Sequence, residues 1–205
     1  DAFVVEEPAT AGGHLGAMTM EQVYDPVLSL GVAVPEVVKY VAEEMRSDVP
    51  VIAAGGVLHG QDVVDLIKMG ANGVQMGSRF ATSAEANSAP MLKEFYLKSK
   101  PEDVVIDATA DDVVLIHSPA GLPGRAIKNP FVAGYLEGHV ESKPCMANCL
   151  THCRYRKTRE TFCIAAALVD AFNGDWENGL FFCGSNVTKV HKLEKVRDII
   201  SELFL

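Results

Sequence analysis

The chain has 205 residues, of which 48% are hydrophobic, and carries a formal net charge of -9 with a sequence pI of about 5.1. This acidic balance argues against general binding to nucleic acids or anionic membranes, because both need clustered cations to neutralise phosphates. No apolar run reaches the roughly 18 residues that span a bilayer, and no basic region followed by an apolar run marks a signal peptide. The length is sufficient for one substantial core and predicts one or two domains.

The cysteine content indicates a reducing compartment. Five cysteines in a chain of this length do not make a disulfide framework, and their number is odd. Reduced thiols in a cytoplasmic protein are therefore the prediction.

The first residues predict a buried strand that is already in progress. The segment Ala2 to Glu6 is apolar up to its last residue and follows Asp1 directly, without an initiator Met. A natural domain rarely begins inside a buried strand. We therefore expect the chain to be a fragment of a longer one, with proteolytic processing as the alternative.

The first half of the chain alternates apolar runs with amphipathic segments. Strands are expected at 50–54 and 73–76, and helices at 35–45 and 61–69. Pro35 would stand in the first turn of one helix, and Gly70 would cap the other. Strands that are apolar on both faces and alternate with helices predict an α/β protein with a parallel sheet.

The second half is more irregular. A helix is expected at 89–98, followed by extended segments at 104–106 and 113–116 and a loop at 121–125. Two further helices are expected, the first at 159–172, ended by Asn173 and Gly174, and the last at 187–203.

Two of the predicted strands end in glycine. The first motif is V-I-A-A-G-G at 51–56, and the second is V-Q-M-G-S-R-F at 74–80. Without side chains in the way, the backbone N–H groups of such turns are open to an anion. In (β/α)₈ barrels the phosphate site follows the last two strands, which matches this pair. The alternative is that the glycines only end βα turns.

Three motifs in this order carry a family resemblance. They are A-G-G-H-L-G at 11–16, V-P-V-I-A-A-G-G at 49–56 and V-Q-M-G-S-R-F at 74–80, and G-L-P-G-R-A-I-K-N-P at 121–130 extends the match. The chain resembles nitronate monooxygenases (2-nitropropane dioxygenases), close to the flavin-dependent enoyl-acyl-carrier-protein reductases. The family often has Thr after Met-Gly, and Ser78 keeps that hydroxyl.

The resemblance implies a fold, a cofactor and its ligands. The expected fold is the C-terminal part of a (β/α)₈ TIM barrel plus a smaller, mostly helical region. The division would be barrel at 1–100, a substrate-side domain at 101–160 and packing helices at 161–205. The cofactor would be FMN, its phosphate held by Gly55, Gly56, Gly77 and Ser78, with Gln75 and Met76 lining the site and Gly12 and Gly13 beside the isoalloxazine.

His14 is the candidate catalytic residue. It follows Gly12 and Gly13 at the end of a strand where barrel enzymes place their chemistry, and an imidazole titrates near neutrality. In the family this histidine removes the proton next to a nitro group or assists nitronate oxidation. The alternative is a loop histidine that hydrogen-bonds to the backbone.

The resemblance leaves three functions open. The first is FMN-dependent oxidation of alkyl nitronates with O₂, the second is reduction of an enoyl thioester with NAD(P)H as electron donor, and the third is a non-catalytic barrel that holds a phosphorylated ligand. The expected partners are a small-molecule substrate, the missing N-terminal part of the barrel and, in addition, a second copy of the chain in a homo-oligomer.

A cysteine-rich basic segment remains outside this assignment. Cys145, Cys149 and Cys153 are spaced so that a helix would place them on one face, with Cys163 or Cys183 as a fourth metal ligand. The spacing matches neither the usual zinc pairs nor ferredoxin runs, so no metal is expected. The neighbouring cations, Arg154, Arg156, Lys157 and Arg159, are either a solvated face or a surface for an anionic substrate.

Overall fold

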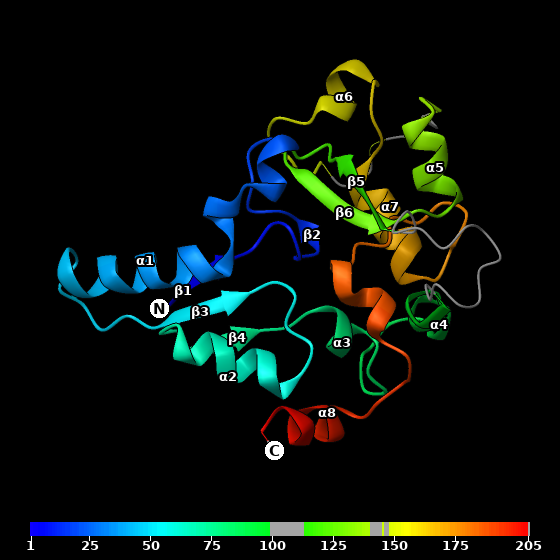
Figure 1. Ribbon diagram of the computed structural model, residues 1–205. Coiled ribbons are helices and arrows are strands. Elements are labelled where there is room, and N and C mark those ends of the chain that lie inside the picture. The colour runs from blue at the N-terminus through cyan, green and yellow to red at the C-terminus, as the bar shows by residue number, and fades with distance from the viewer. Residues whose placement is uncertain (99–112, 140–144, 146–147, 205) are drawn as a thin grey trace.

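The computed structural model describes residues 1–98, 113–139, 145 and 148–204 (Figure 1). The extended segment expected at 104–106 lies outside these ranges. Within them, no helix is both long enough and apolar enough to cross a membrane.

The first half of the chain forms the expected parallel sheet. Its strands β1 (Phe3–Glu6), β3 (Val51–Ala54) and β4 (Gly73–Gln75) pair in the order β1-β3-β4, all parallel. Helices α1 (Leu30–Glu43) and α2 (Gly60–Lys68) make the crossovers between them. The α/β prediction is confirmed.

The register places the ends of the three strands level with one another. Glu6 pairs with Ala54, and Ala54 pairs with Gln75. The glycine turns at 55–56 and at Gly77 therefore leave the sheet at the same edge, where barrel proteins place their sites.

Both crossover helices pack on the sheet in a single core cluster. Val34 of α1, Ala53 of β3 and Leu66 of α2 are all buried and belong to it. Helix α2 ends as expected at Gly70, which has φ +105°, and the N–H of Ala71 bonds to the carbonyl of Leu66 as in a Schellman cap. Helix α8 (Val196–Leu203) lies beside α2 (Figure 1).

Two predictions about this half were wrong in detail. Helix α1 begins at Leu30, so Pro35 lies inside the helix and leaves the carbonyl of Gly31 without its usual donor. Burial of Leu30 against the sheet favours the earlier start. The predicted strand at 2–6 exists, but Phe3 and Val4 are 41% and 52% exposed, because β1 is at the edge of the sheet and β3 is its one partner among the described strands.

A second, antiparallel sheet was not anticipated. It pairs β2 (Gly13–His14) with β6 (Pro123–Ile127) and β6 with β5 (Val113–His117). The loop expected at 121–125 therefore contains the start of a strand. This pairing connects the parallel sheet to the second half of the chain, because β2 lies in the loop after β1 and pairs with β6. Helices α5 (Pro130–Leu136) and α7 (Ile164–Phe172) share a core cluster with this sheet.

The expected helix at 159–172 begins later than predicted. Helix α6 (Arg154–Thr158) ends at Arg159 in a left-handed conformation with φ +61°, and Cys163 is extended, so α7 starts only at Ile164. Its end at Asn173 is as predicted.

The expected final helix at 187–203 is interrupted. A 3₁₀ turn, η4 (Ser185–Lys189), comes first, and residues 190–195 are not helical. Glu194 lies in this break, where its carbonyl accepts from the N–H of Ala84 and its carboxylate binds Arg79. These tertiary bonds replace helical ones. The remaining elements are the short helix α3 (Ser78–Ala81), α4 (Pro90–Lys98) and the 3₁₀ turns η1 (Glu21–Tyr24) and η2 (Pro26–Leu28).

The cysteine segment does not form a helical face. Cys145 and Cys149 lie outside the helices, and Cys153 caps the start of α6. The shared helix face, which the spacing would give only in a helix, therefore does not form. Among the described residues no group of three or more His, Cys, Asp or Glu side chains could hold a metal ion.

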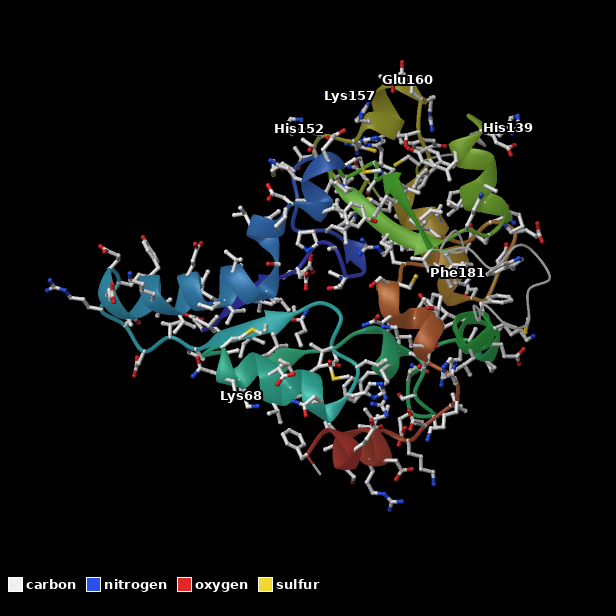
Figure 2. All side chains as sticks on the ribbon, viewed as in Figure 1. Lys68, His139, His152, Lys157, Glu160 and Phe181 are labelled. Atoms are coloured by element: carbon white, nitrogen blue, oxygen red, sulfur yellow. The ribbon has the colours of Figure 1, made fainter. Side chains whose placement is uncertain are left out.

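The basic cluster lies on α6 and the residue after it. Figure 2 labels His152 and Lys157, both exposed, at this helix. Arg156 donates to the carbonyl of Leu150, and the Arg159 guanidinium lies 4.5 Å from the centre of the Tyr155 ring. Arg156 and Arg159, two of the four cations, are thus held by contacts within their own segment.

Candidate active site

One cavity of about 280 Å³ opens at the carboxyl edge of the parallel sheet. Its lining includes all eight residues that the sequence predicted for the cofactor, namely Gly12, Gly13, Gly55, Gly56, Gln75, Met76, Gly77 and Ser78. The three sequence motifs, far apart in the chain, therefore meet in space.

The glycine turn after β3 has a backbone conformation that strongly favours glycine. Gly55 and Gly56 have φ of +106° and +70°, a left-handed conformation that other residues rarely adopt. A Cβ atom on Gly55 would also lie 2.9 Å from the Thr10 hydroxyl oxygen. The turn is held by Asn186, whose side-chain amide donates to the carbonyl of Gly56 over 2.6 Å.

The turn after β4 is bare for a different reason. A Cβ atom on Gly77 would meet nothing within 4 Å, so this residue faces open space. In the described ranges, the N–H groups of Gly56 and Gly77 donate to no backbone carbonyl. Amides without a carbonyl partner, on two glycines that line the cavity, are the kind of donors that an anion such as a phosphate requires.

The glycine loop that precedes His14 packs against the C-terminal part of the chain. A Cβ atom on Gly12 would lie only 2.4 Å from the backbone of Cys183 and Gly184, so no other residue fits there. Gly184 donates its N–H to the Ser78 hydroxyl over 3.1 Å. Gly184 itself also lines the cavity.

His14 lies at the rim of this cavity. Its side chain is not part of the lining, but Gly13 and Phe182 are, and the Phe182 ring contacts the imidazole edge-on with 5.2 Å between ring centres. The Nε2 atom of His14 lies 2.6 Å from the hydroxyl oxygen of Ser118, so the alternative of a backbone-bonded histidine does not hold for this nitrogen. Partial burial lowers the pKa of His14 below its usual 6.5, which favours the neutral, proton-accepting form.

Two charged residues that sequence reasoning missed hold the loop of His14. Arg125, 3% exposed, donates through Nη1 to the carbonyls of Pro8 (3.0 Å) and Ala11. Glu6, which lines the cavity, accepts the N–H of Gly16 at 2.8 Å, and burial raises the pKa of its carboxyl. A polar residue at the end of a predicted strand was the signal for Glu6.

Arg79 and Ser118 were missed as well. Arg79 lines the cavity directly after Ser78, and it is buried. Ser118 is buried at the end of β5, and its place after a predicted extended segment was the only sequence signal for it.

Parallel strands joined by helices, with bare turns around one cavity at their carboxyl ends, define an α/β protein of the kind that binds its ligand at the strand ends. The family model described as nitronate monooxygenase matches residues 1–205. The chain belongs to the nitronate monooxygenase family, which confirms the resemblance seen in its motifs.

A curated relative agrees with this assignment, and solved structures share the fold. A probable nitronate monooxygenase of Staphylococcus aureus (strain Newman) is 32% identical over 143 residues, which is 69% of this chain and 36% of the relative. FabK from Thermotoga maritima is 26% identical with a TM-score of 0.68, covering all of this chain and 53% of FabK. Nitroalkane oxidase from Streptomyces ansochromogenes, 19% identical with a TM-score of 0.63, shares the fold over all of this chain and 50% of its own.

The chain is thus shorter than the proteins that it matches. It spans about half the length of these solved structures, and its match spans about a third of the curated relative. The activity, substrates and partners of the whole protein are therefore proposals.

Proposed function

We propose that the complete protein is a flavin-dependent oxidoreductase that binds FMN in this cavity and oxidises alkyl nitronates with O₂. The observation that carries the proposal is the convergence of all eight predicted cofactor residues on one cavity. Membership of the nitronate monooxygenase family supports the same reaction.

The residues present fit a phosphorylated flavin. The free amides at Gly56 and Gly77 would hold the phosphate, and the open space in front of Gly77 leaves room for it. Gly12 and Gly13 line the same cavity and would border the ring system, next to Phe182. Bound there, FMN would supply a two-electron acceptor that exchanges electrons with O₂.

His14 would perform the proton transfer. Because partial burial lowers its pKa, the neutral imidazole would accept the proton from the carbon next to the nitro group of a neutral nitroalkane, which leaves the nitronate that is then oxidised. Ser118 fixes the ring through Nε2, and Phe182 packs against its edge, so the orientation of the ring is set by contacts on two sides.

The test is a spectrum followed by kinetics. The protein from the complete reading frame should show flavin absorbance or take up FMN stoichiometrically, and it should consume O₂ with an alkyl nitronate. His14→Ala should retain FMN and lose most of the O₂ consumption that starts from a neutral nitroalkane, typically about 10²- to 10⁴-fold for a general base. His152→Ala, an exposed histidine at the start of α6, serves as the matched control. A protein that neither contains nor takes up FMN would remove the proposal.

A second candidate is an NAD(P)H-dependent enoyl-thioester reductase that uses the same cavity. The observation in its favour is that FabK exceeds the nitroalkane oxidase both in identity, 26% against 19%, and in TM-score, 0.68 against 0.63. Under anaerobic conditions this enzyme would consume NADH or NADPH only when an enoyl thioester is added. If no enoyl thioester accelerates that consumption, the candidate is eliminated.

The third candidate, a non-catalytic phosphate-binding barrel, remains the alternative to both. It predicts that the protein binds FMN or another phosphorylated ligand, and that any residual turnover is the same in the wild type and in His14→Ala. The domain division at 1–100, 101–160 and 161–205, the contribution of further barrel strands from the complete protein, the homo-oligomer and the cytoplasmic location stay predictions. Size-exclusion chromatography of the complete protein tests the oligomer.

A further inference from the structure

Arg79 joins the two glycine turns of the cavity. It follows Gly77 by two residues, and its Nη1 donates over 2.6 Å to the carbonyl of Leu58, which follows Gly56 by two residues. The Leu58 peptide is fixed in turn, because its N–H donates over 2.8 Å to the Asp62 carboxylate at the start of α2. One guanidinium therefore spans the gap between the two turns.

The same guanidinium is bound by the C-terminal segment. Its Nε and Nη2 donate to the Oε2 atom of Glu194, over 3.2 and 3.1 Å, and Nη2 also donates to Glu202 of α8. Glu202 uses its other oxygen to bind Nδ1 of His59, at 3.0 Å. The C-terminal helix is thereby attached to the residue that precedes α2 as well as to Arg79.

The charges argue against the obvious role for this arginine. A cation beside a predicted phosphate turn would ordinarily be assigned to the phosphate. Here the Arg79 side chain is only 6% exposed, and two carboxylates already face its single positive charge. Burial by itself lowers the pKa of Arg79, but the hydrogen bonds that Arg79 donates to Glu202 and Glu194 outweigh this effect, so the pKa is raised overall.

We propose that Arg79 is a positioning residue: it sets the spacing of the two glycine turns and couples that spacing to the C-terminal helix through Glu194 and Glu202. The ligand phosphate is then held by backbone amides and not by the Arg79 charge. This inference rests on the proposed function, since it concerns how the same cavity grips a phosphorylated ligand.

A positioning role and a phosphate-binding role of Arg79 predict opposite changes in the Kd for FMN. Glu202→Gln removes one carboxylate from the guanidinium. If Arg79 links the two glycine turns to α8, a link called the tether below, this change weakens the link. The Kd for FMN should then rise by about threefold to thirtyfold, as for a residue that acts through a packed network. A guanidinium that itself bound the phosphate would be released from a competing anion, and the Kd would fall.

Two ligands and one control variant distinguish a loss of the tether from general destabilisation of the cavity. The complete protein, freed of flavin, is titrated with FMN and with riboflavin, which lacks the phosphate, and quenching of flavin fluorescence gives each Kd. We expect the Kd for FMN to rise and the Kd for riboflavin to change by less than about twofold. Asp198→Asn is the matched control on α8, because Asp198 is exposed and its carboxylate contacts Arg197 instead of Arg79.

A second variant tests the tether without removing the negative charge of residue 202. Glu202→Asp preserves the carboxylate but shortens its reach, so a tether predicts weaker FMN binding here too. Circular dichroism of each apoprotein checks that the variants are folded. An E202Q protein that matches D198N for FMN, binds FMN more tightly, or loses FMN and riboflavin equally would overturn the tether. A wild-type protein that binds no FMN would overturn the proposed function and the tether with it.

Discussion

The imidazole of His14 and the hydroxyl of Ser118 approach to 2.6 Å between Nε2 and Oγ, although 104 residues separate them in the chain. The Ser118 oxygen also accepts the N–H of Ala120 at 3.2 Å, so the hydroxyl is fixed by its own turn. The orientation of the candidate base therefore depends on the turn after β5 and not only on the loop that carries the base.

Removal of that hydroxyl should impair the reaction without impairing cofactor binding. Ser118→Ala leaves the imidazole free to rotate, and loss of one hydrogen bond of about 0.5–1.5 kcal/mol predicts a fall in kcat/KM of about twofold to tenfold. Steady-state oxygen consumption with a neutral nitroalkane, whose α proton the base must remove, measures it. Ser88→Ala is the control, because the buried Ser88 hydroxyl has no partner among the described residues. Equal kinetics for the two variants would mean that Ser118 does not orient the base.

The pH dependence should follow from the lowered pKa of His14. A base must be deprotonated to accept a proton, so kcat/KM should be low in acid and rise with pH to a plateau. Because partial burial lowers the pKa of His14, the apparent pKa of this rise should lie below the usual value of 6.5. A rate profile measured on the complete protein gives this value. If the rise is centred above 6.5, another group controls it.

Two glycine substitutions should separate ligand space from packing. Gly77→Ala places a methyl group where nothing lies within 4 Å, at an ordinary φ of -114°, so the melting temperature should stay close to wild type while FMN binds more weakly. Gly12→Ala drives a methyl group to 2.4 Å from the backbone of Cys183 and Gly184. That overpacking should cost about 1–3 kcal/mol of folding free energy.

Thermal unfolding and FMN titration of both variants provide the check. The expected pattern is a binding defect for G77A and a stability defect for G12A. A destabilised G77A with normal FMN affinity would contradict the assignment of Gly77 to the ligand space.

The ion pair of Glu202 should stabilise the fold only above acidic pH. The hydrogen bond from Arg79, followed by that from His59, lowers the pKa of Glu202 from the usual 4.5 to about 2. A carboxyl whose pKa is lowered by folding contributes its stability above the unfolded value and loses it as the pH falls toward the folded value. The difference in melting temperature between wild type and Glu202→Gln should therefore be constant above about pH 5 and shrink from about pH 4.5 downward.

Differential scanning fluorimetry across this pH range measures the difference, in which the titration of all other carboxyls largely cancels. A difference that grows as the pH falls would contradict the ion pair.

The thiols should differ sharply in reactivity. Burial raises the pKa of Cys183 to about 12, whereas Cys149 is exposed. Alkylation requires an accessible thiolate, so brief treatment of the folded protein with iodoacetamide should modify Cys149 and spare Cys183. Peptide mass spectrometry locates the label, and a denatured sample, in which both are modified, is the control. Rapid labelling of Cys183 in the folded state would show that the cavity wall opens.

Local sequence determined much of the first half of the molecule. The period of apolar residues and the glycines that follow them were enough for the parallel sheet, for α2 with its cap at Gly70, and for the two bare turns at the strand ends. These features depend on backbone conformations that few residues other than glycine adopt, and on burial patterns that repeat along a short segment.

Tertiary structure decided the rest. Burial of Leu30 extends α1 through Pro35, and the bonds of Glu194 to Ala84 and Arg79 interrupt the C-terminal helix. The residues that orient the site also come from distant segments, as Ser118 does for His14. In each case, burial and hydrogen bonds between residues far apart in the chain override a local conformational preference of about 1–3 kcal/mol. A short stretch of sequence contains the local preference but not the distant residue that overrides it.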